Sequence, residues 1–294
     1  MKVPEMQEAR MAARHESESE RYFQSVEGQF DHLRVDAGSL CWWCRSNAAT
    51  TGEHKFKRSS LTRLMGEEQL LFWGDGNTLK QIRGKSGVAR DRHGVVKFPK
   101  SMCAACNNSA SQPFDHAYDV YAKYIEEYYL RHAPGIGMQA IYGEQWKGKV
   151  QDLARYHAKH FGCRMVRTGL PVPQSLRDFM DGADDMPDAQ MCLISTDSVH
   201  KMRTSLSISP DFVWANKTIT RFDSYTMAAY IGPIGVRYRW QLGGIPPESR
   251  SQFFHHPVPV LNFFKTEFDM AVGKTRRPGW LPRLLQWAAK PSGS

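Results

Sequence analysis

Apolar side chains recur at helical spacing near the middle of the chain. Over residues 113–132 they return at intervals of three and four, which predicts a helix with one buried face, and Pro113 suits its first turn. A second helix is expected over about 143–160, and a short one follows Pro173. The apolar positions of the first helix are Phe114, Ala117, Tyr118, Tyr121, Ile125 and Tyr128.

Beyond the acidic stretch DGADDMPDA the pattern changes to short runs of β-branched and aromatic residues, which predict strands. Several runs alternate, as in Val236-Arg237-Tyr238-Arg239-Trp240. Because the connections are short and contain Gly and Pro, an antiparallel sheet is favoured over a parallel one. The runs are MCLISTD, DFVWANKTITRFD, TMAAYIG, GVRYRWQL and PVPVLNFF.

Residues 35–112 lack apolar periodicity and are rich in Gly, Ser and Asn. This composition is typical of a small unit that a metal ion holds together in place of a large core. Residues 1–34 predict one or two helices, and the tail after Pro282 predicts a short amphipathic one. We therefore expect an α+β protein with an N-terminal helical segment (1–37), a metal-held domain (38–135) and a C-terminal α+β domain (136–294).

Composition and charge narrow the functional classes. No apolar run approaches the roughly 18 residues of a membrane span, and the N-terminus lacks the apolar stretch of a secretory signal. We therefore expect a cytoplasmic protein with no membrane partner. The formal net charge is +9, and residues 41–112 carry 12 Lys and Arg against 5 Asp and Glu. Such a basic excess suits a partner that carries phosphates, although a solvated basic face is the alternative.

Four of the six cysteines form two C-x-x-C pairs, Cys41/Cys44 and Cys103/Cys106. Two residues between cysteines let both sulfurs face one tetrahedral ion, so the two pairs together predict a structural Zn²⁺ site. A redox site at Cys41-Trp42-Trp43-Cys44 is disfavoured, because the βαβ context is absent and redox chemistry needs no second pair. About sixty residues separate the pairs, which predicts a functional insert between them.

The insert contains Glu53-His54, and Asn107 directly follows the last cysteine. The order C-x-x-C, acidic residue plus His, then C-x-x-C-Asn leading into a helix resembles the HNH (His-Me finger, ββα-metal) endonuclease family. The resemblance covers about residues 38–125, which is less than a third of the chain. Each element alone is weak, and the ordered combination is what makes the resemblance specific.

The resemblance implies a β-hairpin followed by a helix, with His54 as the general base that takes a proton from the attacking water. An imidazole with an ordinary pKa suits that role at neutral pH. Glu53 and Asn107 match the positions that hold the catalytic Mg²⁺ or Mn²⁺, and carboxylate and amide oxygens suit such a cation. The implied reaction is hydrolysis of DNA phosphodiester bonds, leaving a 5′-phosphate and a 3′-hydroxyl.

Three features depart from the family pattern. The stretch Lys97–Met102 has no Asn at the position that often orients the histidine, and the insert after His54 is long. A further metal ligand on the finger helix is open between Asp115 and His116. Arg83-Gly84-Lys85-Ser86-Gly87 lacks the spacing of a P-loop, so no nucleotide cofactor is expected.

Purely structural roles for the same residues remain alternatives. Asn107 can cap the helix that follows it, and Glu53 and His54 can be ordinary surface residues. A non-catalytic zinc-finger binder of nucleic acid, or a zinc-stapled adaptor for other proteins, would keep the cysteines without needing Glu53 or His54. By family analogy, we expect a DNA endonuclease or nickase of antiphage defence or a mobile element, acting beside other proteins of a defence complex.

Overall fold

A computed structural model describes residues 28–36, 38–65, 70–74, 79–83, 97–128, 135–195, 206–208, 211–231, 234–246, 259–262 and 264–265. The helices are η1 (Asp31–Leu33), α2 (Arg58–Met65), η2 (Ala105–Ala110), α4 (Gln112–Tyr128), α5 (Met138–Tyr142), η4 (Gly143–Gln145), α6 (Trp146–Thr168) and α7 (Gln174–Met180). The strands are β1 (Leu70–Gly74), β2 (Leu79–Arg83), β3 (Gly135–Gly137), β4 (Ala189–Ser195), β5 (Leu206–Ile208), β6 (Phe212–Ala215), β7 (Phe222–Ile231), β8 (Ile234–Gln241), β9 (Val260–Asn262) and β10 (Phe264–Lys265).

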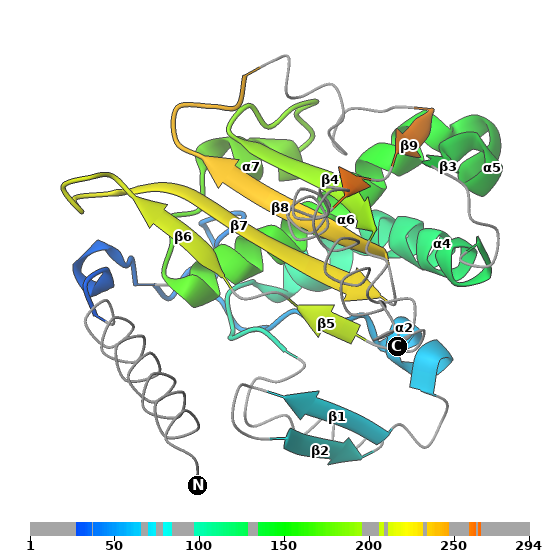
Figure 1. The fold of residues 1–294 in the computed structure, drawn as a ribbon, viewed down its shortest axis with the longest axis horizontal. Helices are drawn as coiled ribbons and strands as arrows, with labels where there is room; N and C mark the ends of the chain where they lie inside the picture. Colours follow the sequence, from blue (N-terminus) through cyan, green and yellow to red (C-terminus); the bar gives the residue numbers. More distant parts are fainter. Residues whose placement is uncertain are drawn as a thin grey trace, which may run out of the picture.

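The main sheet has the strand order β10-β4-β8-β7-β5, and β6 also pairs with β7. Its centre is the long hairpin of β7 and β8, in which Ser224 lies opposite Gln241 and Ile231 opposite Ile234. All the pairs are antiparallel except β10 with β4, which is parallel. The prediction of an α+β protein with an antiparallel C-terminal sheet is confirmed, with this one short parallel pair as the difference (Figure 1).

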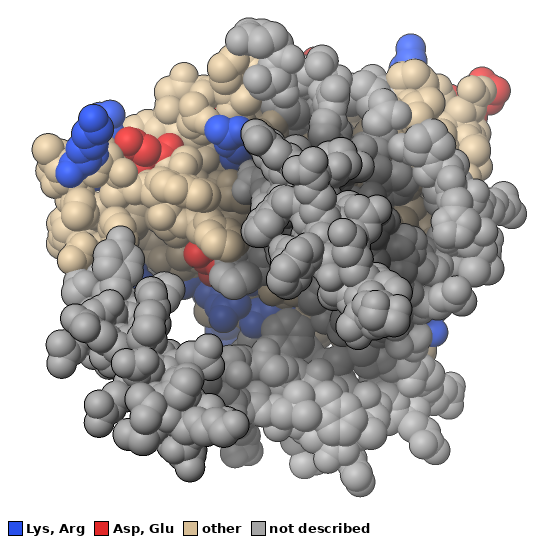
Figure 2. All heavy atoms as spheres, in the orientation of Figure 1, with Lys and Arg blue, Asp and Glu red and all other residues tan. Residues whose placement is uncertain are grey.

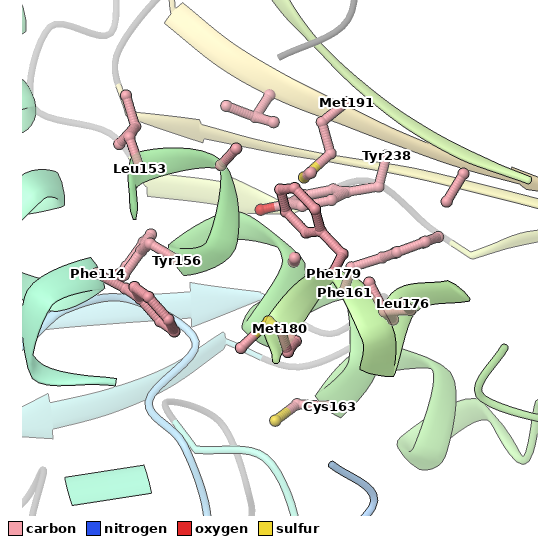
Figure 3. Close-up of a cluster of buried hydrophobic side chains, with 14 of the residues drawn as sticks. Phe114, Leu153, Tyr156, Phe161, Cys163, Leu176, Phe179, Met180, Met191 and Tyr238 are labelled. Atoms are coloured by element: carbon pink, nitrogen blue, oxygen red, sulfur yellow. The ribbon is translucent and has the colours of Figure 1, made fainter. Parts of the chain in front are cut away.

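Helix α6 lies between the main sheet and α4 (Figure 1). Towards the sheet, the ring of Phe161 stacks on Tyr238 at 5.5 Å between centroids and on Tyr225 at 5.6 Å (Figure 3 shows Phe161 and Tyr238). Towards α4, the ring of Tyr156 stacks on Tyr118 at 3.9 Å. Aromatic pairs at such distances add to the stabilisation from burial alone. One cluster of buried side chains runs from Cys41 to Leu261, and the division into three parts stays a prediction.

The predicted helices are present with shifted bounds. The helix expected over 113–132 is α4, of which residues 129–132 lie outside the described part, and the short helix after Pro173 is α7. The helix expected to end near 160 continues to Thr168, where Gly169 adopts a left-handed conformation (φ 77°) and caps it. Four buried polar residues interrupt the apolar pattern of its second half, namely His157, Lys159, His160 and Arg164.

The insert between the cysteine pairs contains elements that its composition did not predict. Helix α2 follows the Glu53-His54 segment, and β1 and β2 form an antiparallel hairpin with Leu70 opposite Arg83. Of the helices expected over residues 1–34, residues 1–27 lie outside the described part, and residues 28–33 form a turn and the short 3-10 helix η1. The helix expected after Pro282 also lies outside the described residues. Within the described part of the chain, no helix has both the length and the apolar character needed to cross a bilayer.

Candidate metal centre and active site

The four cysteines of the two C-x-x-C pairs meet at one point. Their sulfur atoms all lie within 4.8 Å of one another, and the Sγ atoms of Cys44 and Cys103 are 3.9 Å apart. A tetrahedral Zn²⁺ with Zn–S bonds of about 2.3 Å holds its sulfurs roughly 3.8 Å apart, so the spacing fits that ion. Of the His, Cys, Asp and Glu side chains in the described residues, these four cysteines are the ones that lie close enough together, three or more at a time, to share a metal ion.

The acidities of these thiols also fit a metal centre. Burial and the neighbouring thiol of Cys103 raise the pKa of Cys106 far above its ordinary value, and burial raises that of Cys41. Burial acts the same way on Cys44, but the backbone N–H groups of Ser46 and Asn47 outweigh it and lower its pKa to about 7. Four adjacent thiolates repel one another, and a bound Zn²⁺ removes that repulsion.

The two tryptophans between the first cysteines anchor the centre to the rest of the fold. Trp42 Nε1 donates a hydrogen bond to Cys163 Sγ of α6 at 3.4 Å, and Trp43 Nε1 donates one to Asp181 Oδ1 after α7 at 2.7 Å. Gly162 permits the first contact, because a Cβ at that position would lie 2.5 Å from the ring of Trp42. The cysteine cluster is therefore fixed on α6 and α7 as well as on its own loops.

A narrow antiparallel ribbon connects the cysteine cluster to Glu53 and His54. Thr51 pairs with Met102 and His54 with Lys97, each as an isolated bridge, and Phe98 N donates to Glu53 O at 2.8 Å. The two chains approach so closely that a Cβ on Gly52 would lie 2.3 Å from the carbonyl oxygen of Phe98. Since Met102 directly precedes Cys103, the position of Glu53 and His54 depends on the cysteine cluster.

The carboxylate of Glu53 points into the protein, with its side chain 12% exposed. Its Oε2 lies 3.2 Å from Lys159 Nζ and its Oε1 lies 3.5 Å from His160 Nε2, both on α6. Burial by itself would raise the pKa of Glu53, but the interactions with His160 and Lys159 outweigh it and lower the pKa to about 2. Glu53 is therefore a fully ionised carboxylate at neutral pH.

Lys159 extends this cluster to α4. Its Nζ lies 3.1 Å from Asp115 Oδ1 and 3.3 Å from Asp115 Oδ2, and it donates to Ser111 Oγ at 3.2 Å. Ser111 Oγ in turn donates to Asn107 O at 2.7 Å. The structure thus links Glu53, Asp115 and the backbone of Asn107 through Lys159 and Ser111, although these residues come from three separate segments.

Asn107 lies in η2, which is a π-helix. Such turns are rare and occur frequently at functional sites. Its side-chain oxygen Oδ1 is buried and, within the described residues, accepts no hydrogen bond. A buried amide oxygen without a donor costs free energy, so this atom is suited to a ligand such as a cation. His116, the other predicted ligand besides Asp115, lies exposed on α4.

The imidazole of His54 is partly buried at the end of the ribbon. Burial lowers its pKa below the ordinary value, and the positive charge of Lys97 lowers it further, while the charge of Glu53 acts in the opposite direction. A lowered pKa means that the ring is predominantly neutral at physiological pH. His54 can therefore accept a proton, which is what a general base must do.

The described surface on the face drawn in Figure 2 carries both signs of charge. Lys and Arg atoms are interspersed with Asp and Glu atoms over the described surface in Figure 2. Some of the basic side chains near the site form ion pairs with Asp119. Lys57 Nζ lies 2.8 Å from Asp119 Oδ2, and Arg63 Nη1 lies 4.0 Å from Asp119 Oδ1. The segment 84–96, which carries part of the basic excess, lies outside the described residues.

Two residues that sequence reasoning missed, Lys159 and His160, contact Glu53 directly. A signal was present in the sequence, because both lie in the YHAKHF stretch of a helix whose neighbouring positions are apolar. Polar residues on a buried helical face require partners, but the sequence does not say which. No protein-family model, curated protein or solved structure matches the chain.

Proposed function

We propose that this chain is a zinc-stapled endonuclease or nickase of the HNH type, which hydrolyses DNA phosphodiester bonds with the help of a divalent cation. One observation carries the proposal. Glu53 and His54 lie on a ribbon that leads into Cys103, and Asn107 follows Cys106 at the start of the helical segment. Two paired extended segments followed by a helix are the order of elements that the resemblance to this family implies.

The residues of this site have the chemical properties that the reaction requires. His54, neutral because burial and Lys97 lower its pKa, would take a proton from the attacking water. Glu53 is ionised, and Asn107 Oδ1 has no hydrogen-bond donor among the described residues, so both oxygens can serve a hard cation. Bound there, Mg²⁺ or Mn²⁺ would supply electrostatic stabilisation of the negative charge that develops on the phosphate.

The partner in this proposal is DNA, which the basic excess of residues 41–112 would attract through its phosphates. Attraction of this kind depends little on base sequence and falls as salt rises. The proposed biological setting is antiphage defence or a mobile element, beside other proteins of a complex. It rests on the analogy with the family alone.

The test is cleavage of supercoiled plasmid in Mg²⁺ or Mn²⁺, comparing wild type with His54→Ala at equal zinc content. The proposal expects wild type to nick the plasmid and the variant to lose that activity. His32→Ala is the matched control, because it removes a histidine of η1 that, within the described residues, makes no hydrogen bond or ion pair with Glu53 or His54. The Nε2 atom of His32 instead lies 2.8 Å from Ile219 O. Equal cleavage by wild type and His54→Ala would contradict the assignment of the base.

A second function, non-catalytic binding of nucleic acid by a zinc-held module, is favoured by one observation. The ammonium of Lys159 already forms an ion pair with both Glu53 and Asp115, as expected of a purely structural ion-pair network. This function predicts that the zinc-loaded protein binds DNA with either cation present and that no strand is cut.

A further inference from the structure

The cation between Glu53 and Asp115 is supplied by the protein itself. The side chain of Lys159 is fully buried, at 0% exposure, and its three ammonium hydrogens face three acceptors. These are Glu53 Oε2 at 3.2 Å, the carboxylate of Asp115 at 3.1 Å and Ser111 Oγ at 3.2 Å. The ring of Tyr156, with its centroid 5.6 Å away, lies on a further side of the ammonium.

Lys159 is held in this position by α6, which is anchored on both faces. Phe161, two residues further on, stacks on the sheet, and Tyr156 stacks on α4. The ammonium therefore cannot leave the carboxylates without a change of side-chain rotamer in a densely packed region. Among the described neighbours, the other lysine near Asp115 is Lys57, whose Nζ donates to the backbone oxygen of Asp115. This Nζ lies 3.8 Å from Asp115 Oδ1 but 2.8 Å from Asp119 Oδ2, so its closer carboxylate is that of Asp119.

We infer that Lys159 is an intrinsic counter-ion that occupies the cation position between Glu53 and Asp115, and that a divalent cation must displace its ammonium in order to bind both carboxylates. The inference rests on the proposed function for its choice of Glu53 as a ligand, and it adds that α6, outside the predicted nuclease domain, controls access of the cation. Lys159 is a positioning residue here, because it acts through Glu53 and Asp115.

The inference predicts an effect opposite to that of simple damage. Replacing Lys159 with an uncharged residue removes one positive charge from beside two carboxylates, so a divalent cation meets a more negative site. Damage to the fold would instead weaken cation binding. Tighter binding by the variant is therefore a signature that a merely structural lysine would not give.

The experiment is isothermal titration of zinc-loaded protein with Mn²⁺, with zinc content measured before and after. We expect Lys159→Gln to bind Mn²⁺ at least about tenfold more tightly than wild type, because charges a few ångström apart interact strongly inside a protein. Lys159→Arg, which keeps the charge, should bind no more tightly than wild type.

Lys149→Gln is the matched control, since it makes the same substitution on the same helix. Lys149 Nζ also pairs with a carboxylate, Asp152 Oδ2 at 3.3 Å, but its side chain is 30% exposed and remote from Glu53 in this network. Its Mn²⁺ affinity should equal that of wild type. An equal gain in Lys149→Gln and Lys159→Gln would overturn the inference, because the effect would then be one of overall charge.

Unchanged or weaker Mn²⁺ binding by a folded, zinc-loaded Lys159→Gln would also overturn it. If that variant folds only when Mn²⁺ is present, the inference stands, because the added cation then replaces the missing ammonium. Failure to fold with or without Mn²⁺ counts against it. Plasmid cleavage on the same samples separates the two proposals: a gain in affinity without cleavage by any protein refutes the nuclease and leaves the role of Lys159 intact.

Discussion

The cysteine cluster and the Glu53 cluster, which consists of Glu53, Asp115 and Lys159, differ in how the charge of their acidic side chains is balanced. The two lie close together along the chain, since Glu53 follows Cys44 by fewer than ten positions. The four cysteines form a group of thiols whose pKa values are raised at Cys41 and Cys106. Glu53 and Asp115 instead share the ammonium of Lys159. The first group calls for a cation from outside, whereas the second already contains one.

This difference distinguishes the cysteine cluster, which fits a structural metal ion, from the site at which we propose that the chemistry occurs. A metal that is needed to neutralise its ligands becomes part of the folded state, and its removal unfolds the unit. A carboxylate pair that already shares an ammonium from the protein can exist without metal and can exchange that counter-ion. The comparison therefore predicts that loss of zinc affects stability, and that changes around Glu53 affect cation binding and chemistry first.

The largest expected effect follows from breaking the cysteine cluster. Cys106→Ala removes one of four ligands, and structural zinc sites are worth about 10 kcal/mol or more, so bound zinc should fall from about one ion per chain to none. Elemental analysis and thermal unfolding measure this change. Cys192→Ala is the control, because Cys192 is a buried cysteine of β4 outside the cluster. Retention of stoichiometric zinc by Cys106→Ala would contradict the assignment.

The next largest effect concerns the ribbon that connects the two clusters. Gly52→Ala would place a Cβ 2.3 Å from the carbonyl oxygen of Phe98, so the two segments must separate. Overpacking of this kind costs about 1–3 kcal/mol, which urea denaturation would detect as a lower free energy of unfolding.

Gly148→Ala is the control, and we expect it to raise the free energy of unfolding where Gly52→Ala lowers it. A Cβ at Gly148 meets no atom within 4 Å, and the residue lies within α6. Alanine is a better helix former than glycine by up to about 1 kcal/mol, so this variant should be slightly more stable than wild type. Equal destabilisation by both substitutions would show that Gly52 has no special part in joining the clusters.

A last effect, of comparable size but confined to acidic pH, sharpens the comparison on the side of α6. Burial, with a contribution from His160, lowers the pKa of His157 to about 3 in the folded protein, against 6.5 in the absence of such surroundings. The unfolded chain therefore binds a proton at His157 first, and stability is lost as pH falls below about 6.5 and continues to be lost towards about 3. At about pH 5 the loss from this residue is about 2 kcal/mol.

His157→Asn should reduce the acid sensitivity by that amount while keeping a polar partner for the Tyr238 hydroxyl, which lies 3.1 Å from His157 Nδ1. Chemical denaturation of wild type and variant at neutral and mildly acidic pH measures the difference. Equal loss of stability in the two proteins between these pH values would show that His157 does not titrate on unfolding as described.

The sequence predicted what depends on local spacing. The two C-x-x-C pairs come together as expected, because two residues between cysteines already point both sulfurs the same way. The helices α4 and α7 and the strands β4, β6, β7 and β8 also follow from local patterns of apolar residues, whereas β5 lies outside the runs that predicted strands. The resemblance identified Glu53 and His54 as the residues of interest, and their roles in catalysis stay predictions.

What the sequence could not predict is set by contacts between distant segments. Lys159 reaches Glu53 and Asp115, which lie more than a hundred and more than forty positions earlier in the chain. The apolar pattern of α6 is interrupted at that position, so the predicted helix ended near residue 160 although the observed one ends at Thr168. Helix α2 and the β1–β2 hairpin were not predicted either, because the local sequence of residues 35–112 has no apolar periodicity that would indicate them.

The most direct test of the account measures DNA binding and strand cleavage on the same zinc-loaded samples of wild type and His54→Ala. The account predicts similar affinity for DNA in both proteins. It also predicts that the nicking rate in Mg²⁺ or Mn²⁺ falls about a hundredfold or more in the variant, since that is the usual contribution of a general base. Equal nicking by the two proteins, or DNA binding without cleavage by wild type, would contradict it.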